Sequence, residues 1–304
     1  MNIPKIPKSA LALATLAVVG IYLFATAPAE LEENVGGRRD VPVETLFRML
    51  DAENASVRAL YTSEVVGPGL KQGLKYREDW RLKDVHAGPL PALLLRETAN
   101  RLQQRVPDLS LFLGSTYPIE ASNLFKGVQL KHFETLERDL APKFFLDDST
   151  GRYTAMFPDI ASAQPCVKCH NEHPKSPRKD WKLNDVMGAT TWSFARKDVS
   201  VDELVTILAA YRASAIESYE AYLKKTAGFA PDTRPQIGER WPAEGMFLPD
   251  VATFRTRVEE RNSAKTLDAL LKAKNAATPT AANASAAAAP ADAPVTASRA
   301  KSAP

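Results

Sequence analysis

The stretch "KFFLDDSTGRYTAMFPDI", residues 143–160, decides the fold class of this 304-residue chain. Two runs rich in aromatic and apolar residues flank the polar segment "DDSTG", whose residue types favour turns. This pattern predicts an antiparallel hairpin. A run of threonine and aromatic residues, "DVMGATTWSFA" at residues 185–195, is typical of a further strand. The sequence therefore predicts a small antiparallel sheet in the middle of the chain.

Amphipathic helices are predicted before the hairpin. Residues 43–66 place apolar side chains at steps of three and four, and the segment "GPG" at residues 67–69 is expected to end that helix. Two more helices are predicted at residues 91–106 and 125–140. Helices followed by a small antiparallel sheet indicate an α+β domain.

The segment after the last predicted strand is helical again. Residues 200–229 form the clearest helical pattern in the chain, and Ser200 with Glu203 fits a capping box at its start. Residues 251–271 indicate one or two short terminal helices. We therefore expect four parts: an N-terminal export segment at residues 1–33, an α+β domain at 40–198, a helical extension at 199–272 and a disordered tail at 273–304.

The two ends of the chain have the composition of non-globular segments. Lys5 and Lys8 precede an uncharged apolar run at residues 10–27, which is long enough to cross a bilayer with its basic end inside. The alternative is a cleaved signal peptide, since small residues follow in "ATAPAE". Both readings place the domain on the periplasmic side of the inner membrane, either anchored or soluble. The alanine- and proline-rich tail has too little apolar surface to fold.

Both cysteines of the chain lie in "PCVKCHNEHP", residues 165–174. A disulfide across two residues would close a very small loop and stabilise little. A thioredoxin-like pair belongs at a strand-to-helix junction, whereas Pro165 and the polar segment after the motif predict a loop. A zinc site needs four ligands, and the chain has no second Cys/His pair.

The spacing CxxCH favours covalent haem over these three alternatives. Two thiols separated by two residues can reach both vinyl groups of one porphyrin, and the next histidine is then carried to the iron. On this reading Cys166 and Cys169 form the thioether bonds and His170 is the proximal iron ligand. The predicted cofactor is one covalent haem c.

Six stretches between residues 43 and 195 match one known family in order: "RALYTSEVV", "HAGPLPA", "VPDLSLFLGSTYPIEASN", "FETLERD", "GRYTAMFPDIASAQPCVKCH" and "HPKSPRKDWKLNDVMGA". Through these stretches, residues 43–195 resemble the exported, PAS-like c-type haem domains found alone in cyanobacteria and ahead of nucleotide cyclases, histidine kinases and chemotaxis receptors. The resemblance implies a PAS-like antiparallel sheet with packed helices and the haem at their junction. It also implies a distal iron ligand from the first helix, which is a cysteine in at least one relative.

This chain has no third cysteine for the distal position. Met49 lies in the helix where the resemblance places that ligand, and His86 lies in a matching loop, so both are candidates. Water or an open iron position is the alternative. Thioether ligation tends to raise the reduction potential, whereas an open position would admit a diatomic gas.

Several functions agree with a single exported haem. The first is redox or gas sensing read by a signalling partner, and the second is electron transfer to a redox partner, in both cases with membrane attachment through the N-terminal helix. The third is a haem-bearing accessory subunit of a larger membrane or periplasmic complex. We do not expect an enzyme, because no acid, base or nucleophile constellation is recognisable. A net charge of +3 without a basic and aromatic cluster argues against nucleic-acid binding.

Overall fold

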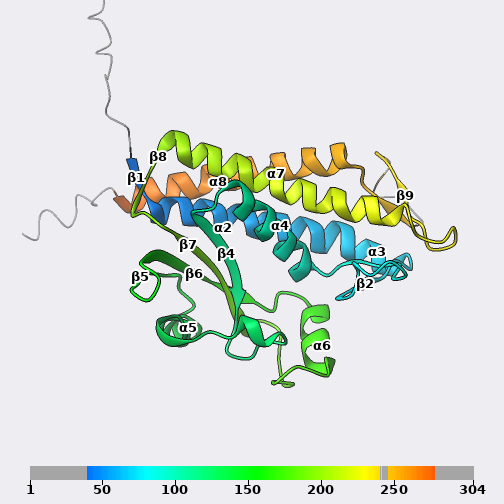
Figure 1. Cartoon of the computed structure of the whole chain (residues 1–304), viewed down its shortest axis with the longest axis horizontal. Coiled ribbons are helices and arrows are strands. Elements are labelled where there is room, and N and C mark those ends of the chain that lie inside the picture. The colour runs from blue at the N-terminus through cyan, green and yellow to red at the C-terminus, as the bar shows by residue number, and fades with distance from the viewer. Residues whose placement is uncertain (1–39, 240, 242–245, 278–304) are drawn as a thin grey trace, which may run out of the picture. The chain divides into compact units, whose positions relative to one another are not determined.

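A four-stranded antiparallel sheet organises the residues described by this computed structural model, which are 40–239, 241 and 246–277 (Figure 1). Its order is β4 (Leu109–Gly114), β7 (Val186–Phe194), β6 (Arg152–Ile160) and β5 (Lys143–Asp147). The hairpin β5–β6 and the strand β7 confirm the sequence prediction, and with the helices they confirm the α+β class. Strand β4 was not predicted, because "LSLFLG" is a short apolar run without alternation.

Both faces of the sheet are covered. Along β6, Ala155 and Phe157 belong to the main core, whereas Met156 between them belongs to a second cluster, as expected for alternating strand residues. Helix α5 (Gly127–Asp139) covers the second face with Phe133 and Leu136. Helices α2, α4, α7 and α8 lie on the other side (Figure 1).

The first helix is longer than predicted. Helix α2 (Val43–Leu60) continues through a π-helical turn, η1 (Tyr61–Val66), into α3 (Gly67–Lys71), with helical backbone at both junctions. The predicted break at residues 67–69 is therefore wrong. A proline inside a helix removes one hydrogen bond and crowds the preceding turn. A wider π turn directly before Pro68 accommodates both effects, and the helix continues.

The other predicted helices agree with the structure except at the C-terminal end. Helix α4 spans Pro91–Arg105 and α7 spans Val201–Thr226, where the Ser200 hydroxyl accepts the Glu203 N–H at 3.2 Å as an N-cap. Residues 251–271 were expected to form one or two short helices. They belong to a single helix, α8 (Val251–Ala277), which continues past residue 273, where the tail was expected to begin.

Three pairs of very short strands complete the secondary structure of the described residues, together with the 3₁₀ turn η2 (Ala121–Asn123) and helix α6 (Gln164–Glu172). Strand β1 pairs with β8 in antiparallel orientation, whereas β2 with β3 and β9 with β10 are parallel. Their bounds are Asp40–Pro42 for β1, Asp198–Ser200 for β8, Tyr76–Arg77 for β2, Gly88–Pro89 for β3, Gln236–Ile237 for β9 and Phe247–Leu248 for β10.

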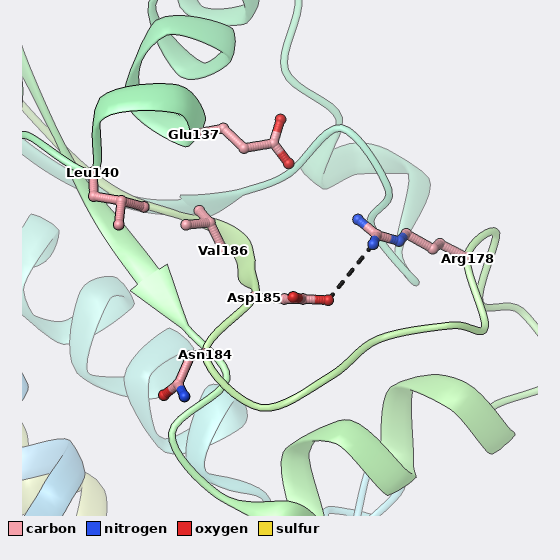
Figure 2. A pocket seen from close by; sticks show the side chains of 6 residues that line it. All are labelled: Glu137, Leu140, Arg178, Asn184, Asp185 and Val186. Atoms are coloured by element: carbon pink, nitrogen blue, oxygen red, sulfur yellow. Dashed lines mark ion pairs between the residues drawn. The ribbon is translucent and has the colours of Figure 1, made fainter.

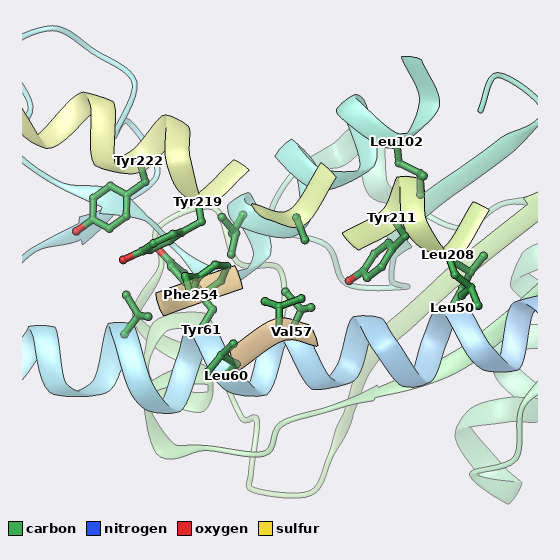
Figure 3. Packing of buried hydrophobic residues seen from close by; sticks show 14 of the residues in the cluster. Leu50, Val57, Leu60, Tyr61, Leu102, Leu208, Tyr211, Tyr219, Tyr222 and Phe254 are labelled. Carbon is green, nitrogen blue, oxygen red and sulfur yellow. The ribbon is translucent and has the colours of Figure 1, made fainter. Parts of the chain in front are cut away.

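The helical extension packs into the main core. Figure 3 shows Leu50 and Val57 of α2 facing Leu208 and Tyr211 of α7. Phe254 of α8 is 1 % exposed and belongs to the same cluster. The sheet, the first helix and the extension therefore share one hydrophobic core.

A group of four tyrosines fills one end of this core. Tyr61 of η1, Tyr76 of β2, and Tyr219 and Tyr222 of α7 meet edge to face or tilted, with ring centroids 6.1 to 6.5 Å apart. The Tyr61 hydroxyl donates to the Pro89 carbonyl at 2.7 Å. This tyrosine cluster joins the first helix to α7.

A buried carboxylate also joins α2 to the extension. The Glu53 side chain is fully buried and forms hydrogen bonds with Arg212 of α7, at 2.5 to 3.1 Å. It also accepts from Asn262 at 3.2 Å and Thr266 at 2.5 Å, both on α8. Three helices therefore meet at one charged group.

No helix among the described residues is long and apolar enough to cross a membrane. The predicted export segment at residues 1–33 and residues 278–304 of the predicted tail lie outside the described residues.

Candidate functional site

The CxxCH motif lies on a helix rather than in the predicted loop. Helix α6 (Gln164–Glu172) has Pro165 in its first turn, and the Cys166 N–H donates to the Ala163 carbonyl at 3.0 Å. Proline is well suited to this position, because the first N–H groups of a helix lack partners anyway. The helix ends at His173, whose extended backbone is the conformation favoured before Pro174.

The helix gathers the three predicted haem residues on one face. Cys166, Cys169 and His170 occupy positions i, i+3 and i+4, which are neighbours on a helix surface. Both thiols are free, Cys169 is exposed and Cys166 is partly exposed. The side chains that would attach and ligate haem are therefore adjacent, and both thiols are open to reaction.

The electrostatics of the motif differ from those of a reactive dithiol. Although Cys169 is exposed as a residue, partial burial of its thiol raises the thiol pKa, and Glu78, Cys166 and Glu172 raise it further. Redox-active cysteines have the opposite shift, because the thiolate is their nucleophile. Burial lowers the pKa of His170, against the field of Asp159. A neutral imidazole is the form that binds iron.

The packing around His170 was only partly visible in the sequence. The His170 ring meets the Trp181 ring edge to face, with centroids 6.5 Å apart. Trp181 is 3 % exposed and forms a small apolar cluster with Ala161, Val167 and Met187. The His170 Nδ1 atom is buried and has no hydrogen-bond partner within the described part of the chain. A histidine directly after two free thiols on one helix face fits a haem ligand.

The first helix approaches the motif through an ion pair. Arg58 of α2 contacts Asp159, near the end of β6, at 2.8 Å. Asp159 acts electrostatically on His170, and Asp51, two turns before Arg58, acts on Arg58. No pattern in the sequence indicates this pair, because the two residues come from elements that meet only in the folded chain.

His173 lies directly after the last turn of α6. Its Nε2 atom is 3.2 Å from Glu78, and its Nδ1 accepts the Lys175 N–H at 3.2 Å. His173 thereby links the motif to the segment after β2.

Neither predicted distal ligand is placed with the motif. Met49 is 2 % exposed in the main core, one turn before the buried Glu53. His86 stacks on Phe229 at 5.2 Å, and its Nδ1 is 3.2 Å from the Thr233 hydroxyl. Both side chains have packing or hydrogen-bonding roles of their own, so their assignment as distal ligands stays a prediction.

A pocket of about 260 Å³ lies on the α5 side of the segment that follows the motif (Figure 2). Figure 2 shows Arg178 extended toward Asp185, at 3.5 Å, with Glu137 of α5 above them. The residues lining the pocket are Glu137, Leu140, Arg178, Asn184, Asp185 and Val186. None of the CxxCH residues lines it, so we do not assign this pocket to haem. Among the described residues, no cluster of three or more His, Cys, Asp or Glu side chains could hold a metal ion.

An α+β fold with a CxxCH motif on a short helix agrees with a cytochrome-like, haem-binding domain, and the family comparison supports that class. The chain belongs to the Tll0287-like family, a haem-binding, sensor-like family whose model matches residues 42–195, about half of the chain. No curated protein and no solved structure matches the chain. The matched range ends just before β8 and helix α7.

Proposed function

We propose that this protein is an exported monohaem c-type cytochrome that acts in redox or gas sensing. Cys166 and Cys169 would form the thioether bonds, and His170 would be the proximal ligand. The observation that carries the proposal is the placement of these three side chains on one face of α6, with both thiols free. The bound haem would supply a redox-active iron with one axial position set by the protein.

A double variant tests the attachment. Cys166→Ala with Cys169→Ala should abolish haem staining of the protein band on a denaturing gel, because no other cysteine remains. His173→Ala is the matched control: it changes a histidine next to the same helix, and we expect it to retain the stain. Staining of the double variant would refute covalent attachment.

The connections of α2 favour sensing over simple electron transfer. Arg58 of α2 contacts Asp159 near the motif. More than one turn before Arg58 on the same helix, Glu53 accepts hydrogen bonds from residues of α7 and α8. A shift of this helix would therefore reach both helices of the extension, which is what a two-state sensor requires. A separate signalling partner would read the change.

Electron transfer is the second candidate function, and the exposure of Cys169 supports it. A haem attached through an exposed thiol would have an edge near the surface, where a redox partner could approach. The third candidate, an accessory subunit of a membrane or periplasmic complex, would show as stoichiometric co-purification.

The visible spectrum distinguishes the first two functions. We expect the reduced protein to bind carbon monoxide or nitric oxide reversibly, or to exchange an axial ligand on reduction, with altered hydrogen exchange in α7. A six-coordinate spectrum that stays unchanged with both gases, together with fast electron exchange, would contradict sensing and favour the carrier.

We also propose that the domain is tethered at the periplasmic face of the inner membrane through residues 10–27. Fractionation of the full-length protein into membrane and soluble pools tests that tether.

A further inference from the structure

Beside the His170 ring lies a second buried polar atom that has no hydrogen-bond partner among the described residues. Within the described residues, neither His170 Nδ1 nor Trp181 Nε1 forms a hydrogen bond, and both atoms are buried. The two rings are nearly perpendicular, at 88°. A buried donor without an acceptor costs free energy. Trp192 and Trp241 in the main core also have unpartnered indole nitrogens, so what distinguishes Trp181 is how the residue is held beside His170.

Trp181 is tied to the residue that follows His170. The Asn171 side-chain oxygen accepts the backbone N–H of Trp181 at 2.9 Å. The Asn171 side-chain nitrogen donates to the backbone carbonyl of Trp181 at 3.0 Å. One side chain therefore satisfies both backbone groups of Trp181. Because Asn171 and His170 are neighbours in α6, this pair of bonds holds the Trp181 backbone next to the turn that carries the imidazole.

The indole is also held by an arginine. The Arg178 guanidinium lies over the Trp181 ring at 4.0 Å, a favourable cation–π contact. Asp180 contacts Arg178 at 2.7 Å and Asp185 contacts it at 3.5 Å, so the guanidinium is itself held from two directions. Tyr117 meets the indole edge to face at 6.2 Å.

An iron-bound histidine needs such support. The orientation of an iron-binding imidazole depends on the groups around the ring, and these outer groups also tune the properties of the metal. Ordinary packing would require only an apolar side chain at position 181, since Ala161, Val167 and Met187 surround it. The bonds from Asn171 and the contact with Arg178 go beyond that requirement.

We propose that Trp181, fixed by Asn171 and Arg178, is a positioning residue that sets the ring plane of the proximal ligand His170. This inference rests on the proposed function, in which His170 ligates haem iron. It also assigns a role to residues 174–182, the segment after the motif: this segment places Trp181 against α6.

The test compares two variants with a matched control in the full-length haem protein. Trp181→Phe keeps an aromatic, apolar side chain but removes the indole. Asn171→Ala removes the two hydrogen bonds that hold the Trp181 backbone. Trp241→Phe is the control, because Trp241 is also buried with an unpartnered Nε1 but belongs to the main core. The readouts are the haem stain, the electron paramagnetic resonance spectrum of the oxidised iron, and the midpoint potential.

We expect Trp181→Phe and Asn171→Ala to keep the haem stain, to broaden the resonance signals into several species and to shift the midpoint potential in the same direction. Trp241→Phe should leave all three readouts unchanged. Unchanged resonance and potential in both test variants, with haem retained, would overturn the positioning role. A wild-type protein without haem stain would overturn the proposed function itself. If Trp181→Phe fails to fold, Asn171→Ala alone decides, since Asn171 lies at the partly exposed end of a short helix.

Discussion

At the scale of single residues, Asp51 is a carboxyl whose ionisation is strongly altered. Burial raises its pKa from 3.8 to about 7, while Arg58 and the indole of Trp192 act in the opposite direction and Asp159 raises it further. Asp51 lies on α2, on the same helix as Arg58, which contacts Asp159 beside the motif. Protonation of Asp51 therefore changes the field at Arg58, whose ion-pair partner Asp159 acts electrostatically on His170.

This shift predicts a pH dependence of stability. The folded protein binds the Asp51 proton more tightly than the unfolded chain does, so the contribution of Asp51 is most favourable below about pH 4 and is lost as the pH rises toward 7. We expect Asp51→Asn to reduce the difference between the free energies of unfolding at pH 5 and pH 8, measured by urea denaturation. Asp148→Asn, in the exposed hairpin turn, is the control and should leave that difference unchanged. An equal pH dependence in the wild type and Asp51→Asn would refute the assignment.

The residues of the candidate site were predictable to different degrees. Cys166, Cys169 and His170 follow from spacing alone, because the chemistry of attachment fixes that spacing. Asn171 is adjacent to the motif but is an ordinary polar residue in sequence. The Arg58–Asp159 pair brings together residues about a hundred positions apart, and no local pattern indicates such a pair.

At the scale of elements, the buried Glu53 holds α2 against α7 and α8. Its removal would leave Arg212 without its ion-pair partner, and breaking a buried pair in this way costs about 3–5 kcal/mol. We expect Glu53→Ala to lower the free energy of unfolding by an amount in that range, measured by chemical denaturation.

The control for this prediction is an exposed pair on α7. Glu220 contacts Lys224 at 3.0 Å, one turn away on the surface, where such pairs contribute only about 0.3–0.5 kcal/mol. A loss for Glu53→Ala no larger than the loss for Glu220→Ala would show that the buried network does not hold the three helices together.

Helices were predicted best where their apolar period is long, as in α2, α4 and α7. The prediction failed where a proline was taken as a stop signal. Pro68 follows a π turn inside a continuous helix, and Pro165 begins the helix that carries the motif. In both cases the position of the proline relative to the helix start decides its effect, and that position is a property of the folded chain.

At the scale of the whole molecule, the hydrophobic core extends beyond the family match. Tyr211 and Tyr219 of α7 and Phe254 of α8 are at most 1 % exposed and pack in the same cluster as α2 and the sheet. The α+β class and the haem-binding family could be predicted from sequence. The joining of the extension to this core could not, because an apolar stripe on a helix does not identify the surface that it will cover.

This shared core predicts that the matched segment is not an independent folding unit. A chain that ends at Ala195 would expose the face of α2 that α7 and α8 cover, so we expect no cooperative thermal transition by circular dichroism. A chain that ends at Ala277 is the control, since it keeps both helices, and should unfold cooperatively. Cooperative unfolding of the shorter chain with an unchanged midpoint would contradict the prediction.

The tyrosine cluster has an optical consequence. Tyr61, Tyr76, Tyr219 and Tyr222 are held in a fixed asymmetric arrangement by elements from both halves of the chain. Aromatic rings in fixed packing give a near-ultraviolet circular dichroism signal that disappears when the packing loosens. The protein therefore contains a built-in spectroscopic reporter of helix docking, in a wavelength range well separated from the strongest visible absorption of a haem.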